Sequence, residues 1–294
     1  MSFENLIIVG DRINPQGFKS TAKLIQEEDL EGLQALAVKQ VEAGSSFVDL
    51  TIGPRAYEDL EFLQKVVIAL QEAIDVPLCI DYPVKHIVEA CLKVYDLEKS
   101  GGKPPLINSF AETRMEMFEL LDICPCKVVL MTSEFVDSNG AAKSSKKSED
   151  IVEAARRLIR KSIDDYGLTL DDLFVDVTIN SLVSDTQGLT KMALNAIRDI
   201  CADPDMKGVH IIGGLTNIGN MVPKIEFDGM SLRHCLESAF LTRAVPLGFD
   251  TVLGTPWNRF TALADDHPVM NAFDEVIELT GLDAMRRLRQ LWAK

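Results

Sequence analysis

The sequence has few histidines and no paired cysteines, which argues against a protein-bound metal. Its four histidines are scattered, without the H-E-x-x-H or H-x-x-E-H spacing of zinc ligands. The six cysteines include no C-x-x-C, and Cys124 and Cys126 form the only close pair. No histidine or second cysteine pair is placed to complete four ligands beside them. We therefore expect buried, reduced thiols and no metal site.

Long apolar runs and an excess of basic residues are also missing. No apolar stretch approaches the ~20 residues that span a bilayer. The chain begins with an acidic rather than a basic segment, unlike a signal peptide. With 30 Lys and Arg against 45 Asp and Glu, the net charge is −15, without the basic stripe of nucleic-acid-binding proteins. We expect a cytoplasmic protein that binds neither membranes nor nucleic acids.

Eight short apolar runs recur along the chain, and nearly every one ends at a small polar or acidic residue. They are Leu6–Val9, Phe47–Leu50, Leu78–Ile80, Leu106–Ile107, Val128–Met131, Leu173–Val175, His210–Ile212 and Val252–Leu253. Their repeat of ~35 residues suits a strand, a helix and two loops. Between them lie segments of helical period, such as Leu30–Val41 and Leu232–Ala244, and Val269–Leu291 predicts one long closing helix.

Strands that alternate with helices predict a parallel α/β sheet. The apolar runs are continuous, which is typical of strands buried on both faces. Eight such units predict a single (β/α)8 TIM barrel, whose active site lies at the carboxyl ends of the strands. No linker or low-complexity tract marks a boundary, so we expect residues 1–294 to form one domain.

The residues that we expect to point into the barrel mouth, at or soon after the strand ends, are rich in Asp and Asn. They are Asp11, Asn14, Asp49, Thr51, Asp81, Asn108, Ser109, Thr132, Asp176, Asn180, Asn217, Asn220 and Asn258. This set contains no Ser-His-Asp combination for nucleophilic catalysis. No predicted strand ends in Lys, as a Schiff-base enzyme would require. Gly213 and Gly214 lack the rest of a barrel phosphate site.

Carboxylate and amide side chains in this number suit a planar heterocycle with donors on one edge and acceptors on the other. An ionised Asp accepts two parallel N–H bonds, while an Asn both donates and accepts. A pterin or a guanine has such an edge. The alternative is that Asp and Asn after a strand simply form turns or cap helices.

Six short motifs lie at these strand ends, in order and with barrel spacing. They are Gly10–Asn14, Val48–Pro54, Leu78–Asp81, Leu106–Ser109, Phe174–Asp176 and Gly214–Asn217. Together they resemble the pterin-binding methyltransferases that act on methyltetrahydrofolate and a corrinoid protein. These enzymes are related to the folate domain of cobalamin-dependent methionine synthase and, more distantly, to dihydropteroate synthase. The resemblance extends from about residue 5 to about residue 290.

The resemblance implies a role for each matched position. Asp176 would read the amide and amino edge of the pterin, Asp81 and Asn108 would hold the opposite edge, and Asn217 would lie near N5 and act in catalysis. The further candidates for pterin contact are Asp49, Asn14, Gly214 and Asn220. Tetrahydrofolate or methyltetrahydrofolate would be the substrate, and the cobalamin would belong to a separate corrinoid protein that docks on the barrel rim. A homodimer and no protein-bound metal are also implied.

The sequence departs from the family pattern in several places. Thr51 replaces an Asn, and Asp11 stands where a Glu is usual. The loop after Asn217 is longer and lacks an Arg, for which Arg233 is the candidate substitute. A dihydropteroate synthase would need a Lys near the seventh strand and an Arg-x-His at the eighth. The eighth strand is followed instead by residues 254–258, Gly-Thr-Pro-Trp-Asn, which argues against that activity.

The predicted function is therefore methyl transfer between N5 of tetrahydrofolate and the cobalt of a corrinoid protein, in a direction that the sequence leaves open. N5 must be protonated or strongly hydrogen-bonded if the methyl leaves it, and must present its lone pair if the methyl arrives. Two alternatives remain: a condensation like that of dihydropteroate synthase, and a carrier that binds folate without catalysis. The original methyl donor of the pathway is not encoded in this chain.

Two segments exceed ordinary loop length, and both follow predicted strands on the rim side. Glu134–Lys147 is polar and poor in apolar residues, so we expect it to be mobile. Asn217–Gly229 follows the seventh strand. Lys143, Lys146 and Lys147 would give the first segment a local positive patch for steering an acidic corrinoid protein. The alternative is an ordinary solvated surface loop.

Overall fold

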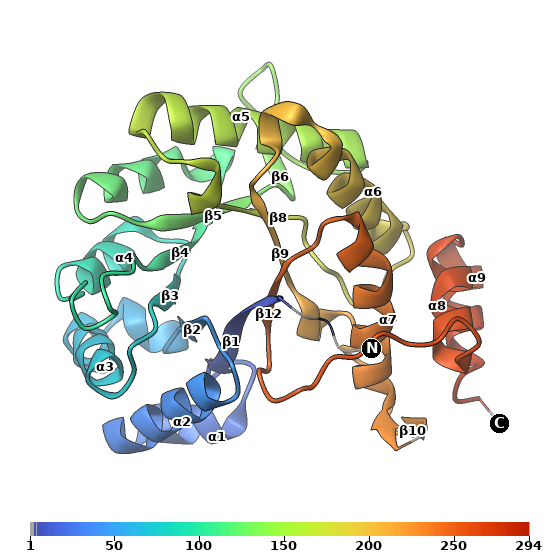
Figure 1. The fold of residues 1–294 in the computed structure, drawn as a ribbon, viewed down its shortest axis with the longest axis horizontal. Helices are drawn as coiled ribbons and strands as arrows, with labels where there is room; N and C mark the ends of the chain where they lie inside the picture. Colours follow the sequence, from blue (N-terminus) through green and yellow to red (C-terminus); the bar gives the residue numbers. More distant parts are fainter. Residues whose placement is uncertain (1–2, 4, 228, 294) are drawn as a thin grey trace.

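The computed structural model describes residues 3, 5–227 and 229–293, and within them eight parallel strands close into a barrel. The barrel strands are β1 (Ile7–Ile13), β2 (Phe47–Leu50), β3 (Leu78–Asp81), β4 (Leu106–Phe110), β5 (Lys127–Met131), β8 (Leu173–Asp176), β9 (His210–Gly214) and β12 (Thr251–Gly254). Each strand pairs with the next around the ring, and β12 pairs with β1 to close it (Figure 1). The predicted (β/α)8 TIM barrel is confirmed, and each predicted apolar run lies in one of these strands except for Leu6, which precedes β1.

The helices surround the barrel and cover its strands (Figure 1). They are α1 (Lys19–Gln26), α2 (Leu30–Glu42), α3 (Leu60–Ala73), α4 (Lys85–Leu92), α5 (Ser148–Tyr166), α6 (Leu189–Ala202), α7 (Leu232–Ala244), α8 (Pro268–Ile277) and α9 (Gly281–Arg289). The carboxylates of Asp29 and Asp59 and the hydroxyl of Ser231 accept N–H bonds at the starts of α2, α3 and α7. These side chains satisfy backbone donors that a helix start leaves unpaired. A 3₁₀ helix, Glu112–Asp122, follows β4 in place of an α-helix.

The inside of the barrel is built in layers along its axis. A central apolar layer contains Val9, Phe47, Cys79, Leu106, Val129, Phe174 and Ile212, with Leu253 packed against it. Successive side chains of a strand point to opposite faces, so residues two positions away share the inward direction. The inward positions nearest the carboxyl ends of the strands are Asp11, Asp49, Asp81, Asn108, Met131, Asp176, Gly214 and Thr255. This pattern gathers the predicted strand-end residues at one mouth of the barrel.

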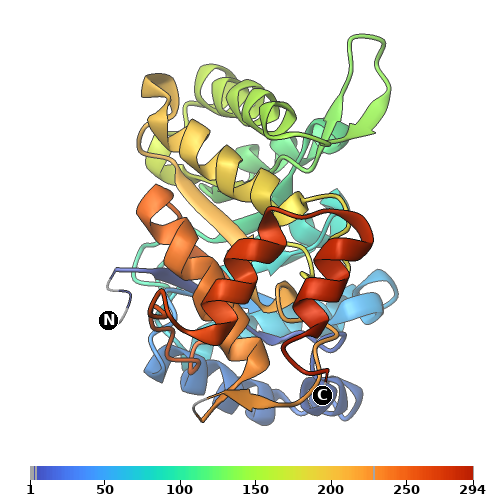
Figure 2. The same ribbon diagram turned by 90° about the vertical axis from the view of Figure 1, so that its right-hand side faces the viewer.

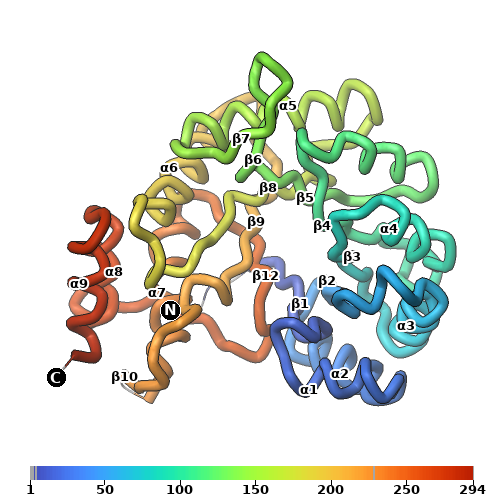
Figure 3. The backbone as a smooth tube through the Cα atoms, turned by 180° about the vertical axis from the view of Figure 1, so that it is seen from behind, coloured from blue at the N-terminus to red at the C-terminus, as the bar shows by residue number. Residues whose placement is uncertain are grey.

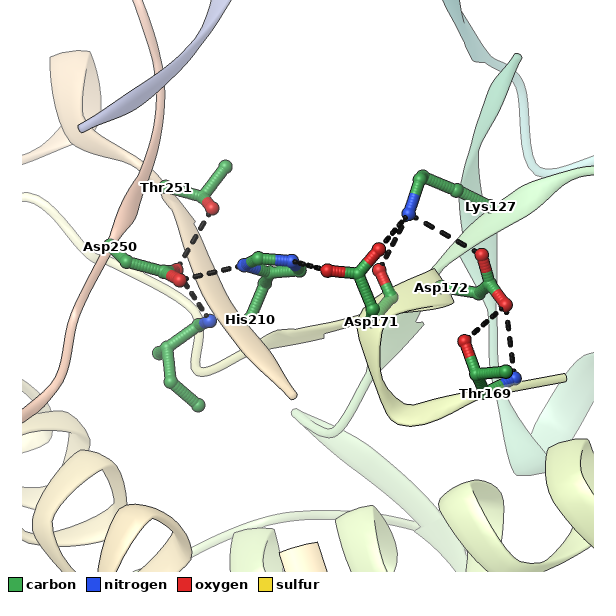
Figure 4. Close-up of polar contacts among 8 residues, drawn as sticks. Lys127, Thr169, Asp171, Asp172, His210, Asp250 and Thr251 are labelled. Atoms are coloured by element: carbon green, nitrogen blue, oxygen red, sulfur yellow. Dashed lines mark hydrogen bonds and ion pairs between the residues drawn. The ribbon is translucent and has the colours of Figure 1, made fainter. Parts of the chain in front are cut away.

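The opposite end of the barrel carries an ionic network, which we call the Lys127–His210 network (Figure 4). The Lys127 ammonium lies 2.7 Å from a carboxylate oxygen of Asp171 and 3.3 Å from one of Asp172. The His210 ring contacts Asp250 at 2.7 Å through Nδ1 and Asp171 at 3.3 Å through Nε2. Residues at the amino-terminal ends of barrel strands usually serve stability. His210 thus lies at the amino-terminal end of the barrel, remote from the mouth, where a structural role is the usual one.

The closing helix differs from the sequence prediction. The apolar period of Val269–Leu291 predicts one long helix, but the chain forms α8 and α9, which lie side by side beyond α7 (Figures 1 and 2). Gly281 has φ +60°, a left-handed conformation that interrupts a right-handed helix. Its N–H donates to the Thr186 carbonyl at 2.8 Å, which fixes the turn against a distant loop. The prediction of a single helix is wrong for this reason.

The long segment after β5 is folded rather than irregular. It forms an antiparallel hairpin, β6 (Glu134–Val136) and β7 (Ala142–Ser144), which we call the rim hairpin and which projects from the barrel (Figures 2 and 3). A carboxylate oxygen of Asp137 accepts the N–H groups of Asn139 and Ala141, each at 2.9 Å, and so closes the turn. Local hydrogen bonds thus give this segment two short strands without apolar burial, and its mobility stays a prediction.

The second long rim segment also contains a short antiparallel pair, β10 (Glu226–Phe227) and β11 (Met230–Ser231). It leads directly into α7, whose first residue, Leu232, follows β11. Asp228, between the two strands, lies outside the described residues. In the part of the chain that the structure covers, no helix combines the length and apolar character that crossing a membrane would need.

Candidate functional site

Four inward aspartates share the barrel mouth, from β1, β2, β3 and β8. Burial raises the pKa of Asp81 to about 6, and the negative charge of Asp176 contributes to that shift. Burial likewise raises the pKa of Asp176 to about 6, although the N–H of Thr178, 2.7 Å from its Oδ1, acts in the opposite direction. The two carboxyl groups are therefore close enough to influence each other, and both change charge near neutral pH.

Asn108 lies beside this acidic pair. It is the register partner of Asp81 in the β3–β4 ladder, so the two side chains stand next to each other on the inward face. An amide next to a carboxyl group gives the mouth one group that donates and accepts beside one that accepts. The structure brings Asp81, Asn108 and Asp176 together as the sequence predicts.

Asp49 lies deeper than the other predicted contacts. Its side chain is 1% exposed, and Oδ1 has no hydrogen-bond partner among the described residues. Burial raises the pKa of Asp49 well above its usual range, and the nearby charges of Asp81 and Asp11 raise it further. The proximity of these three carboxyl groups disfavours the ionisation of all of them together.

Asp11 is the fourth of these aspartates, and hydroxyl groups hold it in place. Thr255 Oγ1 donates to its Oδ1 at 3.2 Å, and Thr216 Oγ1 donates to its Oδ2 at 3.4 Å. Burial still raises the pKa of Asp11 above its ordinary value. These contacts tie β1 to the segments that follow β9 and β12 and so shape one wall of the mouth.

A polar cavity of about 630 Å³ opens beside the aspartates, under the segments that follow β1, β9 and β12. It is lined by Asp11, Arg12, Asn14, Gln16, Gly17, Phe18, Thr216, Asn217, Asn220, Ser231, Arg233, Glu237, Thr255, Trp257 and Asn258. Three of the predicted substrate contacts therefore face this cavity: Asn14, Asn217 and Asn220. We call it the rim cavity.

Asn217 is held in place by a chain of polar contacts. Its Oδ1 accepts the amide N–H of Asn220 at 3.2 Å. The Asn220 Oδ1 in turn accepts a guanidinium N–H of Arg233 at 2.6 Å, and the same guanidinium group donates to the Thr216 carbonyl at 2.8 Å. Arg233 thus reaches the loop after β9, at the place where the sequence suggests it as a substitute.

Gly214 is small because the Asn217 amide packs over it. A β-carbon at position 214 would lie 2.9 Å from the Asn217 Nδ2 atom, which is closer than such contacts allow. The predicted role of Gly214 in the site is consistent with this geometry, since the glycine makes room for a neighbouring side chain.

Asn14 shows the local role that the alternative interpretation assigns to such residues. Its Oδ1 accepts the backbone N–H groups of Gln16, at 3.0 Å, and Gly17, at 3.2 Å. This is an Asx turn, and Asn14 also lines the rim cavity.

Sequence reasoning missed a buried glutamate in the wall of the rim cavity. Glu237, on α7, is 1% exposed, and burial raises its pKa to about 7. It is the only acidic residue of the segment Leu232–Ala244, and it lies within the apolar pattern rather than opposite it. A single acidic residue within an apolar helical pattern indicates a buried carboxyl group, and the sequence contains this signal. Arg12 and Trp257, which also line the cavity, carry no comparable signal.

The cysteines lie away from the mouth. Cys79 belongs to the central apolar layer, and Cys124 and Cys126 lie just before β5, at the amino-terminal end of the barrel. The Cys126 thiol donates to the Cys124 carbonyl at 3.1 Å. Within the described residues, no group of three histidine, cysteine, aspartate or glutamate side chains is arranged to hold a metal ion.

Comparisons with known proteins point to one family. A family model described as a pterin-binding enzyme matches residues 10–253. Among curated proteins, the methylcorrinoid:tetrahydrofolate methyltransferase of Eubacterium limosum is 28% identical over 262 residues, with 86% of each chain covered.

Solved structures share the fold at low sequence identity. The dihydropteroate synthase of Thermus thermophilus has a TM-score of 0.55 at 16% identity and covers 94% of this chain and 93% of its own. The dihydropteroate synthase of Stenotrophomonas maltophilia, with imidazole in its active site, has a TM-score of 0.57 at 16% identity, with 99% and 94% covered. At these identities the likeness concerns the fold alone.

Proposed function

This chain belongs to the pterin-binding enzyme family, and we propose that it transfers a methyl group from a corrinoid protein to N5 of tetrahydrofolate. The observation that carries the proposal is the group of Asp81, Asn108 and Asp176 at the barrel mouth, next to a cavity that contains Asn217. The direction follows the name of the Eubacterium limosum relative, which places the methyl on the corrinoid before transfer.

The acidic mouth would bind the pterin through its edges. An ionised Asp176 accepts N–H bonds from the amide and amino edge of the ring, and each charge-assisted bond of this kind contributes about 1.5–3 kcal/mol. Asp81 and Asn108 would hold the opposite edge. Because the pKa of Asp81 is about 6, this side chain can either accept or donate a hydrogen bond near neutral pH.

Asn217 would orient N5 for the transfer. Its Oδ1 accepts one bond from Asn220 and keeps a second lone pair, which can accept the N–H of N5 and leave the N5 lone pair free for the methyl group. N5 attacks the methyl carbon with its lone pair, and the cobalt–carbon bond breaks with both electrons left on the cobalt. Holding the two reacting centres in line can lower the barrier by roughly 7–11 kcal/mol.

The corrinoid is a substrate carried by another protein in this proposal. A corrin ring is too wide to enter a barrel mouth, so the partner would cap the rim, over the rim hairpin and the loop after β9. A homodimer and a single domain over residues 1–294 remain predictions, of which analytical ultracentrifugation tests the first.

Methyl transfer with free methylcobalamin tests the function directly. Under anaerobic conditions, the protein with tetrahydrofolate should convert methylcobalamin to cob(I)alamin, followed by its absorbance, and should form methyltetrahydrofolate in equal amount. Folate binding without any transfer would indicate a carrier. Formation of dihydropteroate from a pterin pyrophosphate and 4-aminobenzoate would indicate a dihydropteroate synthase; either result would overturn the proposal.

A further inference from the structure

Glu237 is a buried carboxyl group that faces the rim cavity with one oxygen unsatisfied. Its Oε2 accepts the Asn258 amide at 3.3 Å. Its Oε1 has no hydrogen bond to any described residue, and the nearest cation, the Arg233 Nε atom, lies 3.6 Å away. A buried acceptor without a partner is costly unless a ligand or a proton completes it.

The position of Glu237 connects it to the reacting end of the site. It lines the same cavity as Asn217. Arg233 contacts both Glu237 and Asn220, and Asn220 donates to Asn217. A carboxyl group, a guanidinium group and two amides therefore form one polar wall on the side of the cavity where N5 would lie.

The charges around Glu237 leave its protonation near balance at neutral pH. The charged or titratable groups that surround it are Arg233 and His234 of α7, Asp11 and Arg12 of β1, and Arg259 after β12. Burial raises the pKa of Glu237 to about 7, while Arg233 and the Asn258 hydrogen bond act in the opposite direction. The His234 Nδ1 atom lies 3.8 Å from Oε2, and burial lowers the pKa of His234, so this ring is neutral at pH 7.

We propose that Glu237 accepts the proton that N5 of tetrahydrofolate releases when it is methylated. This inference rests on the proposed function and adds to it a proton acceptor in the wall of the cavity that Asn217 lines. A proton acceptor works best when its own affinity for protons matches the working pH.

Atoms and electrons balance in this step. The N5 lone pair forms the bond to the methyl carbon, and the cobalt–carbon bond breaks with its electron pair kept by cobalt, which is reduced from Co(III) to Co(I). The proton on N5 moves to the Glu237 carboxylate, directly or through one cavity water, and then to solvent. No other oxidant or reductant is required.

A purely structural role is the competing explanation. Glu237 could only hold Arg233 and Asn258, and so keep the cavity wall in place. Glutamine at this position keeps the side-chain shape and one acceptor oxygen for Asn258, but it cannot take up a proton at neutral pH. Glu237→Gln therefore separates the two roles.

The test measures methyl transfer from free methylcobalamin to saturating tetrahydrofolate between pH 5.5 and 9. In the wild-type protein, turnover should rise with pH through about 7, because the carboxylate form accepts the proton. In Glu237→Gln, that rise should disappear and turnover above pH 7.5 should fall at least tenfold. Tetrahydrofolate affinity, measured by calorimetry, should change by less than about threefold.

Two further variants sharpen the interpretation. Glu237→Asp retains a carboxylate one methylene shorter, so the pH-dependent rise should return at a lower rate. Glu61→Gln, an exposed residue of α3, is the matched control and should behave as wild type. An unchanged pH profile in Glu237→Gln would overturn the role of Glu237 while leaving methyl transfer established. Absence of transfer in the wild-type protein would instead overturn the proposed function itself, and the role of Glu237 with it.

Discussion

At Asp176, burial raises the pKa to about 6, so the side chain is charged at pH 7.5 at a cost to folding. Replacing it by Asn keeps an acceptor for the Thr178 N–H group and removes the charge. We expect Asp176→Asn to stabilise the folate-free protein at pH 7.5 by about 1–3 kcal/mol. Its affinity for tetrahydrofolate should fall at least tenfold, because a charge-assisted acceptor is lost. Thermal unfolding and calorimetry measure the two effects.

The pH dependence of this variant has a defined sign. A pKa raised in the folded state favours folding at low pH, and that contribution is lost as the pH rises through about 6. The stability difference between Asp176→Asn and wild type should therefore shrink when the pH is lowered from 7.5 to 5. Asp75→Asn, an exposed control, should show no such change. Equal folate affinity in Asp176→Asn would mean that the pterin binds elsewhere.

The contact between Gly214 and Asn217 gives a second prediction. The backbone of Gly214, with φ −71° and ψ 83°, is accessible to alanine, so Gly214→Ala should fold normally. Its methyl group would displace the Asn217 amide, which lies 2.9 Å from that position, and turnover should fall about tenfold or more. Asn217→Ala should lower turnover with a smaller effect on folate affinity.

The double variant provides the check on this coupling. If Gly214→Ala acts by moving Asn217, the double variant should be no slower than Asn217→Ala alone. Losses that multiply would show that the two positions act independently.

The strand-end residues of the site were easier to predict from the sequence than Glu237 on α7. Asp81, Asn108 and Asp176 were predictable because a strand's alternation and its carboxyl end define both direction and place. Glu237 was not selected, although it is the only acidic residue in the apolar pattern of Leu232–Ala244, because its place in the wall of the rim cavity depends on how α7 packs against the barrel. Asn14 was predictable only in part. Its turn is formed by neighbouring residues, but its access to the rim cavity depends on the fold of the whole chain.

At the scale of single elements, the rim hairpin carries the prediction about docking. Lys143 lies 3.7 Å from Asp137, while Lys146 and Lys147 are exposed at the base of the hairpin. Replacing residues 135–143 by a tight turn should leave folate binding unchanged and raise the Michaelis constant for the corrinoid protein severalfold. The constant for free methylcobalamin should stay the same, because the hairpin does not line the rim cavity.

A charge variant complements the deletion. Lys146→Glu should weaken the interaction with an acidic corrinoid protein at low salt, and the effect should diminish as salt screens the charges. Lys103→Glu, in an exposed loop before β4 at the other end of the barrel, is the matched control. Similar kinetics for the two corrinoid forms in the shortened protein would exclude the hairpin from the docking surface.

The elements themselves were predictable to the extent that burial dictates their pattern. All eight barrel strands follow from continuous apolar runs, because both faces of each strand are covered. The break between α8 and α9 was missed, since a glycine in a helical pattern reveals its left-handed conformation only when Thr186 fixes the turn. The 3₁₀ helix Glu112–Asp122 after β4 has no distinct signal in the sequence.

For the whole molecule, the Lys127–His210 network links β5, β9 and the starts of β8 and β12. The hydrogen bond that the His210 ring donates to the Asp250 carboxylate raises the pKa of His210 above its ordinary value. A raised histidine pKa stabilises the fold fully below about pH 6.5, and this contribution is lost as the pH rises through the folded-state value. His210→Gln should therefore lower the free energy of unfolding by roughly 1–3 kcal/mol at pH 6 and by less at pH 8.5.

Urea denaturation at the two pH values measures this difference. His86→Gln, an exposed histidine on α4, is the control and should leave the free energy of unfolding unchanged at both. A loss that is the same at pH 6 and pH 8.5 would show that the His210 ring contributes by packing on Phe174, whose centroid lies 4.5 Å away, rather than by its charge.

The central apolar layer lies between these two ionic ends of the barrel. Because the side chains of Asp176 and His210 share no hydrogen-bond or ionic partner among the residues that the structure describes, we expect a substitution at one to change little at the other. The effects of Asp176→Asn and His210→Gln on the free energy of unfolding should then add within about 0.5 kcal/mol. One end of such a barrel can acquire new chemistry through mutation while the other continues to hold the strands together.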